Sequence, residues 1–215
     1  MDMKRIMIFG DSYSTFEGYI PKGYAAYYTK DHTITDVRRV NETWWKRLTD
    51  EIGAEIVMND SWSGSTICYT GYNNTDCSRS SSFIYRLNRY AEENFFEGKD
   101  IDAVFVFGGT NDSWADVNVG RLQYSDWEKQ DLHNVLPAVC FFMKRLKEEL
   151  PKARIIWLIN TELKEEVASG METACGHYGI DYVRFTDIDK AAGHPTVKGM
   201  KMIKDEVLNA VREMA

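Results

Sequence analysis

The chain has 215 residues, of which 44% are hydrophobic and 27% are charged, and its formal net charge is −7 at pH 7. This composition is typical of a soluble globular protein and the length is typical of one domain, so we expect residues 1–215 to form a single domain. The acidic balance, with no basic cluster longer than Arg38-Arg39, argues against nucleic acid as a partner.

The amino-terminal residues lead into an apolar stretch, 6–9, that is shorter than the signal-peptide core of about 7 to 15 residues. No stretch approaches the roughly 20 apolar residues that span a bilayer. The sequence as given therefore predicts a cytoplasmic protein without a membrane span, although a chain that had lost a leader would have the same features.

The cysteines and histidines do not have the spacing of a metal site. No C-x-x-C pair occurs among the cysteines, and neither H-x-H nor H-E-x-x-H occurs among the histidines. We therefore expect reduced structural thiols, no bound metal and no cofactor. The cysteines are Cys68, Cys77, Cys140 and Cys175, and the histidines are His32, His133, His177 and His194.

Five short apolar runs rich in β-branched residues predict strands, and each run ends in turn-forming or polar residues. In chain order they are residues 5–9, 55–59, 103–108, 154–159 and 181–185.

Apolar residues recur at helical spacing between these runs. Segments 44–52, 83–90 and 132–150 have this pattern, and residues 197–214 repeat it at the end. Alternating strands and helices imply right-handed crossovers and a parallel sheet covered on both faces. We expect an α/β fold, a three-layer α/β/α sandwich of flavodoxin-like type, with five parallel strands in the order 2-1-3-4-5.

Two connections, 13–41 and 110–126, exceed about 12 to 15 residues, and loops of that length are usually functional or disordered. The second carries Trp114, with Trp127 nearby. Because both leave the carboxyl edge of the predicted sheet, we interpret them as walls of a substrate cleft; the alternative is that their aromatic side chains pack the loops onto the body of the protein. The first connection contains Phe16, Tyr19, Tyr24, Tyr27 and Tyr28.

Residues that could take part in catalysis follow several of the predicted strands. Ser12 follows the first strand in Gly10-Asp11-Ser12, Gly64 follows the second, Asn111 follows the third, and His194 lies between the fifth strand and the last helix. The carboxyl edge of such a sheet opens into the ligand crevice, so these residues share one edge.

Ester hydrolysis by a serine needs residues of these types. His194 can take the hydroxyl proton of Ser12. The backbone N–H groups of Ser12 and Gly64 and the side-chain amide of Asn111 can form an oxyanion hole. Asp11 and Asp112 are then expected to brace the loops that carry them.

This ordered set resembles the SGNH or GDSL family of esterases and lipases. The family has a serine in a Gly-Asp-Ser turn, a glycine, an asparagine in a Gly-x-Asn-Asp segment and a carboxyl-terminal histidine, which match Ser12, Gly64, Asn111 and His194. The resemblance implies a flavodoxin-like sheet, a serine nucleophile and cofactor-free hydrolysis of acyl esters, thioesters or acetylated sugars.

One position departs from the family pattern. The family usually has an aspartate three residues before the histidine, which holds the imidazole in the right tautomer, and here that position is Ala191. Either Asp189 reaches back to orient His194, with Asp187 the next carboxylate upstream, or a backbone carbonyl accepts the Nδ1 proton and the site works as a Ser-His dyad. We favour the dyad, because residues 190–193 would have to bulge for Asp189 to reach.

We therefore predict a serine esterase whose substrate is a small-molecule ester. The substrate class that we favour is an O-acetylated carbohydrate. The alternative is a ligand-binding protein on the same sheet, either a catalytically weak or inactive SGNH relative or a flavodoxin-like flavin binder. A flavin phosphate after the first strand would lie beside the carboxylate of Asp11, which disfavours the flavin.

Overall fold

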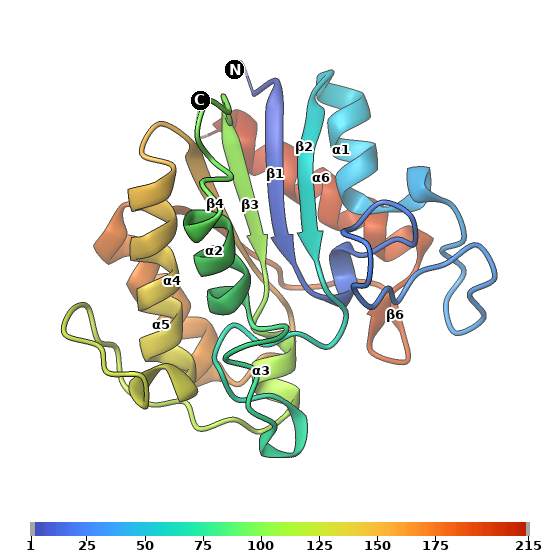
Figure 1. Cartoon of the computed structure of the whole chain (residues 1–215). Helices are drawn as coiled ribbons and strands as arrows, with labels where there is room; N and C mark the ends of the chain where they lie inside the picture. Colours follow the sequence, from blue (N-terminus) through green and yellow to red (C-terminus); the bar gives the residue numbers. More distant parts are fainter. Residues whose placement is uncertain (1–2, 214–215) are drawn as a thin grey trace.

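A five-stranded parallel sheet forms the centre of the computed structural model, which describes residues 3–213. The strand order is β2-β1-β3-β4-β5, so the predicted α/β sandwich is confirmed (Figure 1). Each strand begins at the residue predicted from the sequence. The strands are β1 (Arg5–Gly10), β2 (Glu55–Ser61), β3 (Ala103–Phe107), β4 (Arg154–Ile159) and β5 (Asp181–Arg184).

Helices cover both faces of the sheet, in the three layers seen in Figure 1. On one face α2 (Phe83–Glu92), α4 (Val135–Glu149) and α5 (Glu165–Tyr178) pack against the sheet. On the other face lie α1 (Trp44–Ile52) and α6 (Val197–Glu213). The predicted last helix ran to Met214, which lies outside the described residues.

The two cores follow from the period-2 alternation of side chains along each strand. In β1, Met7 and Phe9 belong to the cluster under α2, α4 and α5. The residues that alternate with them, Ile6 and Ile8, belong to the cluster under α1 and α6. The strands are therefore apolar on both faces, as is expected of a parallel sheet that is covered twice.

Local signals in the sequence set the limits of the helices. The hydroxyl of Thr43 accepts a hydrogen bond from the N–H of Lys46 and caps the start of α1, and Gly53, at φ +70°, ends that helix. Ser82 caps α2 in the same way. None of the helices within residues 3–213 is long and apolar enough to cross a membrane.

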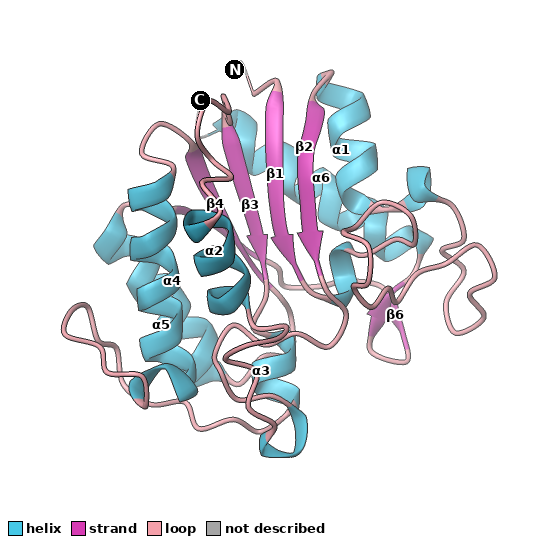
Figure 2. Cartoon of the chain, viewed as in Figure 1, coloured by secondary structure: helices cyan, strands magenta, loops and turns pink. Residues whose placement is uncertain are grey.

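The strands end together, and the loops that leave them gather at one edge of the sheet (Figure 2). In the registers of the central strands, Gly10 lies beside both Ser61 of β2 and Phe107 of β3. The short helix α3 (Thr110–Trp114) and the two-residue strands β6 (Lys190–Ala191) and β7 (His194–Pro195) also lie at this edge. Each predicted site residue therefore lies on a loop or short element at the same end of the sheet.

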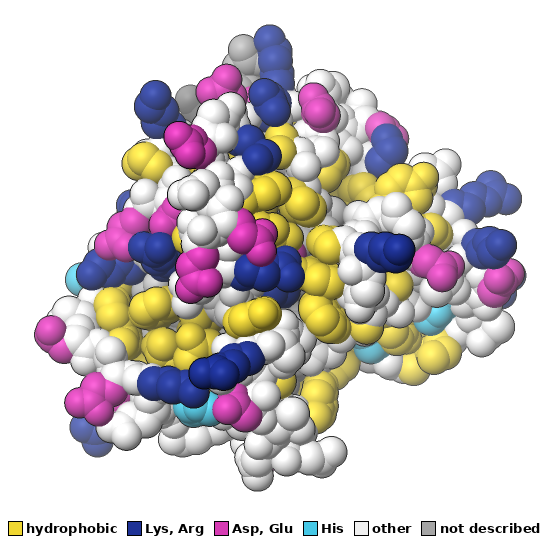
Figure 3. All heavy atoms as spheres, in the orientation of Figure 1, with side chains coloured by type: hydrophobic (Ala, Val, Ile, Leu, Met, Phe, Trp, Pro, Cys, Tyr) yellow, Lys and Arg dark blue, Asp and Glu magenta, His cyan; other side chains and the backbone are white. Residues whose placement is uncertain are grey.

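Acidic and basic side chains are interspersed over the face drawn in Figure 3. That face shows no block of basic residues of the kind that would attract a polyanion.

Candidate active site

Ser12 begins a turn of 3-10 helix, Ser12–Ser14, directly after β1. The carboxylate of Asp11 caps this turn and accepts a hydrogen bond of 3.0 Å from the N–H of Tyr13. The N–H of Asp11 donates to the carbonyl of Phe107 on β3, at 3.2 Å. The backbone of the nucleophile turn is thus fixed to the ends of two strands.

His194 reaches Ser12 from the other end of the chain. Its Nε2 lies 3.0 Å from Ser12 Oγ, which is within the range of a hydrogen bond between a serine nucleophile and its base. The histidine lies on β7, which pairs with β6 in an antiparallel hairpin. Both residues at the tip of this hairpin have positive φ, Ala192 at 48° and Gly193 at 76°, as in a type I′ turn.

A backbone carbonyl, and not a carboxylate, faces the other ring nitrogen of His194. Nδ1 lies 3.2 Å from the carbonyl oxygen of Ala192. The carboxylate of Asp189, the tentative orienting residue, is hydrogen-bonded to the hydroxyl of Thr196 and lies 3.5 Å from Nζ of Lys198. Asp189 therefore does not hold the imidazole in this structure, because the hairpin directs its side chain to the start of α6; Asp187 is exposed.

Aromatic side chains surround the imidazole. Tyr27 stacks on it, with ring centroids 3.6 Å apart and planes at 9°, and Tyr13 and Trp114 contact it edge-on at 5.5 and 5.6 Å. Burial is the main cause that lowers the pKa of His194 below its ordinary value; the hydrogen bond to the Ala192 carbonyl raises it in part, and His32 and Lys190 lower it further. The imidazole is therefore neutral at neutral pH, which is the state that a general base needs.

The loop after β2 carries Gly64, which adopts φ +81°, a conformation that favours glycine. The N–H of Trp62 donates to the carbonyl of Gly10 at 3.0 Å, so this loop is fixed to the end of β1. Among the described residues no hydrogen bond uses the N–H of Ser12 or of Gly64. Both groups are free to donate to a bound ligand.

Asn111, in α3 after β3, is held at the same loop by two hydrogen bonds. Its Nδ2 donates to the carbonyl of Ser65 at 2.9 Å, and its Oδ1 accepts from the hydroxyl of Tyr72 at 2.9 Å. One Nδ2 hydrogen remains for a ligand. Tyr72 could not be predicted as a site residue, because it lies in a polar loop whose sequence gives no sign of a contact with α3.

Asp112 fixes the segment that follows the Gly64 loop. Its carboxylate accepts hydrogen bonds from the N–H groups of Ile67, at 2.9 and 3.1 Å, and of Cys68, at 3.2 Å. The side chain is fully buried, and this burial raises its pKa. Asp112 therefore has the bracing position that the sequence predicted, and so does Asp11 in its own turn.

A buried ion pair that the sequence analysis missed lies beneath both loops. Arg86 of α2 is fully buried and contacts the carboxylate of Asp60 at the end of β2. Its guanidinium also donates to the carbonyl of Gly10 and to Oγ of Ser65, both at 3.3 Å. The available signal was a charged residue on the apolar face of a predicted helix, because position 86 shares a face with Phe83 and Tyr90.

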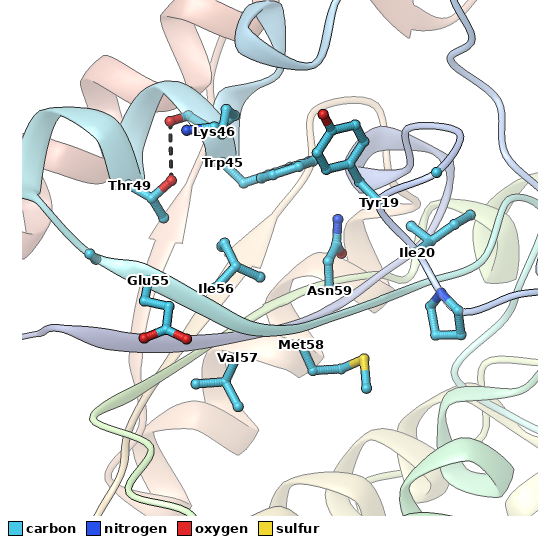
Figure 4. Close-up of a pocket in the computed structure, with 13 residues that line it drawn as sticks. Tyr19, Ile20, Trp45, Lys46, Thr49, Glu55, Ile56, Val57, Met58 and Asn59 are labelled. Carbon is cyan, nitrogen blue, oxygen red and sulfur yellow. Dashed lines mark hydrogen bonds between the residues drawn. The ribbon is translucent and has the colours of Figure 1, made fainter.

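A separate pocket of about 580 Å³ lies along the outer edge of β2, beneath Tyr19 and Trp45 (Figure 4). None of the predicted site residues lines it. Asn59 lines this pocket and also donates from Nδ2 to the carbonyl of Ser14, at 2.9 Å. A hydrogen bond of Asn59 thus links the lining of this pocket to the nucleophile turn.

The profile of the GDSL-like lipase/acylhydrolase family matches residues 4–211. The chain belongs to this family. No curated protein matches the chain. Among solved structures it is similar to two Bacteroides proteins named for their likeness to GDSL lipases. The B. ovatus protein is 38% identical with a TM-score of 0.91, over 99% of this chain and 100% of that one. The B. uniformis protein is 42% identical with a TM-score of 0.90, over 98% and 96%.

More distant structures share the fold of the family. An acetyl xylan esterase from Butyrivibrio proteoclasticus superposes with a TM-score of 0.64 at 15% identity, over 98% of this chain and 64% of that chain. The chain is therefore related to ester hydrolases.

Proposed function

We propose that this chain is a serine esterase that hydrolyses carboxylic esters through an acyl-enzyme on Ser12. The observation that carries the proposal is the 3.0 Å between Ser12 Oγ and His194 Nε2. A neutral imidazole at that distance can accept the hydroxyl proton as the oxygen attacks.

The proposed reaction has two halves. Ser12 Oγ bonds to the ester carbonyl carbon while its proton passes to Nε2 of His194, and the carbonyl oxygen becomes an oxyanion. The oxyanion is met by the N–H groups of Ser12 and Gly64 and by the side-chain amide of Asn111. The alcohol then leaves with the proton from Nε2. A water molecule, deprotonated by the same nitrogen, attacks the acyl carbon. The bond to Ser12 Oγ then breaks as this oxygen takes the proton back from Nε2, and the acid is released.

The substrate that we propose is a small-acyl ester of a carbohydrate. Trp114 and Tyr72 are large aromatic side chains, 40% and 39% exposed, beside His194 and Asn111 respectively. Flat aromatic faces of this kind are suited to the apolar face of a sugar ring. The fold shared with an acetyl xylan esterase supports the same substrate class.

The test is hydrolysis of p-nitrophenyl acetate and of acetylated xylo-oligosaccharides, together with labelling by a fluorophosphonate. We expect the label on the peptide that contains Ser12, and we expect Ser12→Ala to lower kcat by at least about 10³-fold. Ser63→Ala is the matched control, because Ser63 lies in the neighbouring loop and its hydroxyl makes no hydrogen bond among the described residues. Unchanged turnover in Ser12→Ala would refute the proposal.

A further inference from the structure

The base of this site gains a positive charge without a carboxylate to balance it. When His194 takes the proton of Ser12 it becomes an imidazolium, and the acceptor on its Nδ1 is the neutral carbonyl of Ala192. His32 and Lys190 disfavour this charge, and the hydrogen bond to the Ala192 carbonyl favours it without overcoming the cost of burial. Lys190 is itself paired with Glu162 and Thr161. A second group that favours the protonated ring would add to the hydrogen bond between Nδ1 and the Ala192 carbonyl.

The side chain with the right geometry is Tyr27. Its ring lies parallel to the imidazole, at 3.6 Å between centroids and 9° between planes, so the imidazole lies over the negative face of the phenol ring. An aromatic face within about 6 Å attracts a cation, and the attraction grows when water is excluded. Tyr13 and Trp114 meet the imidazole at 62° and 73° and do not present a parallel face.

The stack is fixed relative to the nucleophile. The N–H of Tyr27 donates to Oγ1 of Thr15 at 2.9 Å, and that hydroxyl donates to the carbonyl of Ser12, also at 2.9 Å. A second tie in the same loop joins the N–H of Glu17 to the carbonyl of Tyr28 at 2.9 Å. The ring of Tyr27 is thus held where His194 must lie in order to reach Ser12.

We propose that the aromatic face of Tyr27 stabilises protonated His194 in place of the missing aspartate, and that Tyr27 is a positioning residue for the base. This inference rests on the proposed function for its catalytic meaning. The effect of Tyr27 on the protonation of the His194 ring can be measured without turnover.

The test compares Tyr27→Phe, which keeps the aromatic face, with Tyr27→Leu, which keeps much of the apolar cover but has no face. The titration of His194 is followed by NMR of its ring nitrogens. We expect the pKa of His194 in Tyr27→Phe to equal that in the wild-type protein. In Tyr27→Leu we expect this pKa to be lower by roughly 0.5 to 1 unit. In the esterase assay, kcat of Tyr27→Leu should fall by about 3- to 10-fold with little change in KM, and the acid limb of the pH profile should move to lower pH.

Tyr19→Leu is the matched control. Tyr19 lies in the same loop, is 50% exposed, and contacts Phe16 and Trp45 rather than His194. The inference is overturned if the pKa of His194 in Tyr27→Leu is unchanged or higher, or if Tyr27→Phe behaves like Tyr27→Leu. A wild-type protein that hydrolyses no ester would refute the proposed function alone, because the NMR titration still decides the role of Tyr27.

Discussion

Asn111 is oriented by its two partners, Ser65 and Tyr72. An amide side chain can rotate by 180° and exchange its oxygen and nitrogen. Here the oxygen accepts from the Tyr72 hydroxyl and the nitrogen donates to the Ser65 carbonyl, so only one of the two orientations satisfies both bonds. Oxyanion stabilisation depends on donors that are already in place, so we expect the orientation itself to contribute to the rate.

Substitutions of Asn111 and of Tyr72 should separate the contribution of the oxyanion donor from that of the hydrogen bond that orients it. We expect Asn111→Ala to lower kcat by about 10² to 10³-fold, as is typical of the loss of one oxyanion donor. Tyr72→Phe removes only the hydrogen bond to Oδ1, so a smaller loss of kcat, about 3- to 10-fold, is expected with KM nearly unchanged. Steady-state kinetics on p-nitrophenyl acetate measure both. A loss in Tyr72→Phe that lies entirely in KM would instead mean that the Tyr72 hydroxyl contacts the substrate rather than orienting Asn111.

The hairpin of β6 and β7 is the element that places the base, and it contains one unfavourable residue. Ala192 adopts φ 48°, a left-handed conformation that costs an L-residue roughly 1 to 2 kcal/mol. Its partner in the turn is Gly193, which has no such cost. Type I′ turns prefer Asn-Gly, so this turn has a suboptimal first residue.

We predict that Ala192→Asn stabilises the protein by about 0.5 to 1 kcal/mol, because asparagine tolerates the left-handed region better than alanine. Esterase activity should be retained, since the acceptor for His194 is the main-chain carbonyl. Urea unfolding gives the stability change. Ala192→Val is the opposing control and should destabilise, because a β-branched residue is a poor fit to positive φ. Equal stability of the two variants would contradict this account of the turn.

The strands of the main sheet and most of the long helices could be predicted from the sequence, whereas helix α5 and the short elements could not. Helix α5 was not delimited, because its buried face consists largely of small residues; a Cβ on Gly170 would come within 2.4 Å of Leu136 on α4, so the helices approach closely there. The β6–β7 hairpin was missed because its strands have two residues each and its turn lacks the Asn-Gly signal.

The loop 13–41 combines the two roles that the sequence left open. Phe16 and Tyr28 are buried in the core beneath α1 and α6, which is the packing role, while Tyr27 contacts His194. The sequence could predict that Ser12 and His194 meet, because both are placed by the carboxyl edge of the sheet. The stack of Tyr27 on His194 depends on how an irregular loop folds back, and no periodic pattern predicts that.

The stability of the whole molecule should respond to the ionisation of Asp11. This carboxyl is fully buried, and burial raises its pKa from 3.8 to about 7. Its Oδ1 accepts a hydrogen bond from Tyr13 N–H, which lowers the pKa, but burial has the larger effect. The folded chain therefore binds this proton more tightly than the unfolded chain does, so the contribution of Asp11 to stability falls as pH rises from about 4 to 7.

We predict that Asp11→Asn becomes increasingly more stable than the wild-type protein as pH rises, with a difference on the order of 3 kcal/mol near pH 8 and little difference near pH 4. Asparagine keeps the acceptor for Tyr13 and cannot ionise. Urea unfolding at pH 4.5, 6 and 8 measures the trend. Asp31→Asn, at an exposed position, is the control and should follow the wild-type curve. If the free energies of unfolding of Asp11→Asn and wild type changed with pH in parallel, Asp11 would not titrate as its burial implies.

The carbonyl of Ala192 that faces His194 belongs to the main chain. Replacing any single side chain leaves such an acceptor in place, so a scan of point substitutions would uncover no counterpart of the aspartate on which related hydrolases depend. Adding or deleting one residue in the tight turn would displace it. Among natural variants of this protein, the spacing between positions 191 and 194 should therefore vary less than the identity of the residues within it.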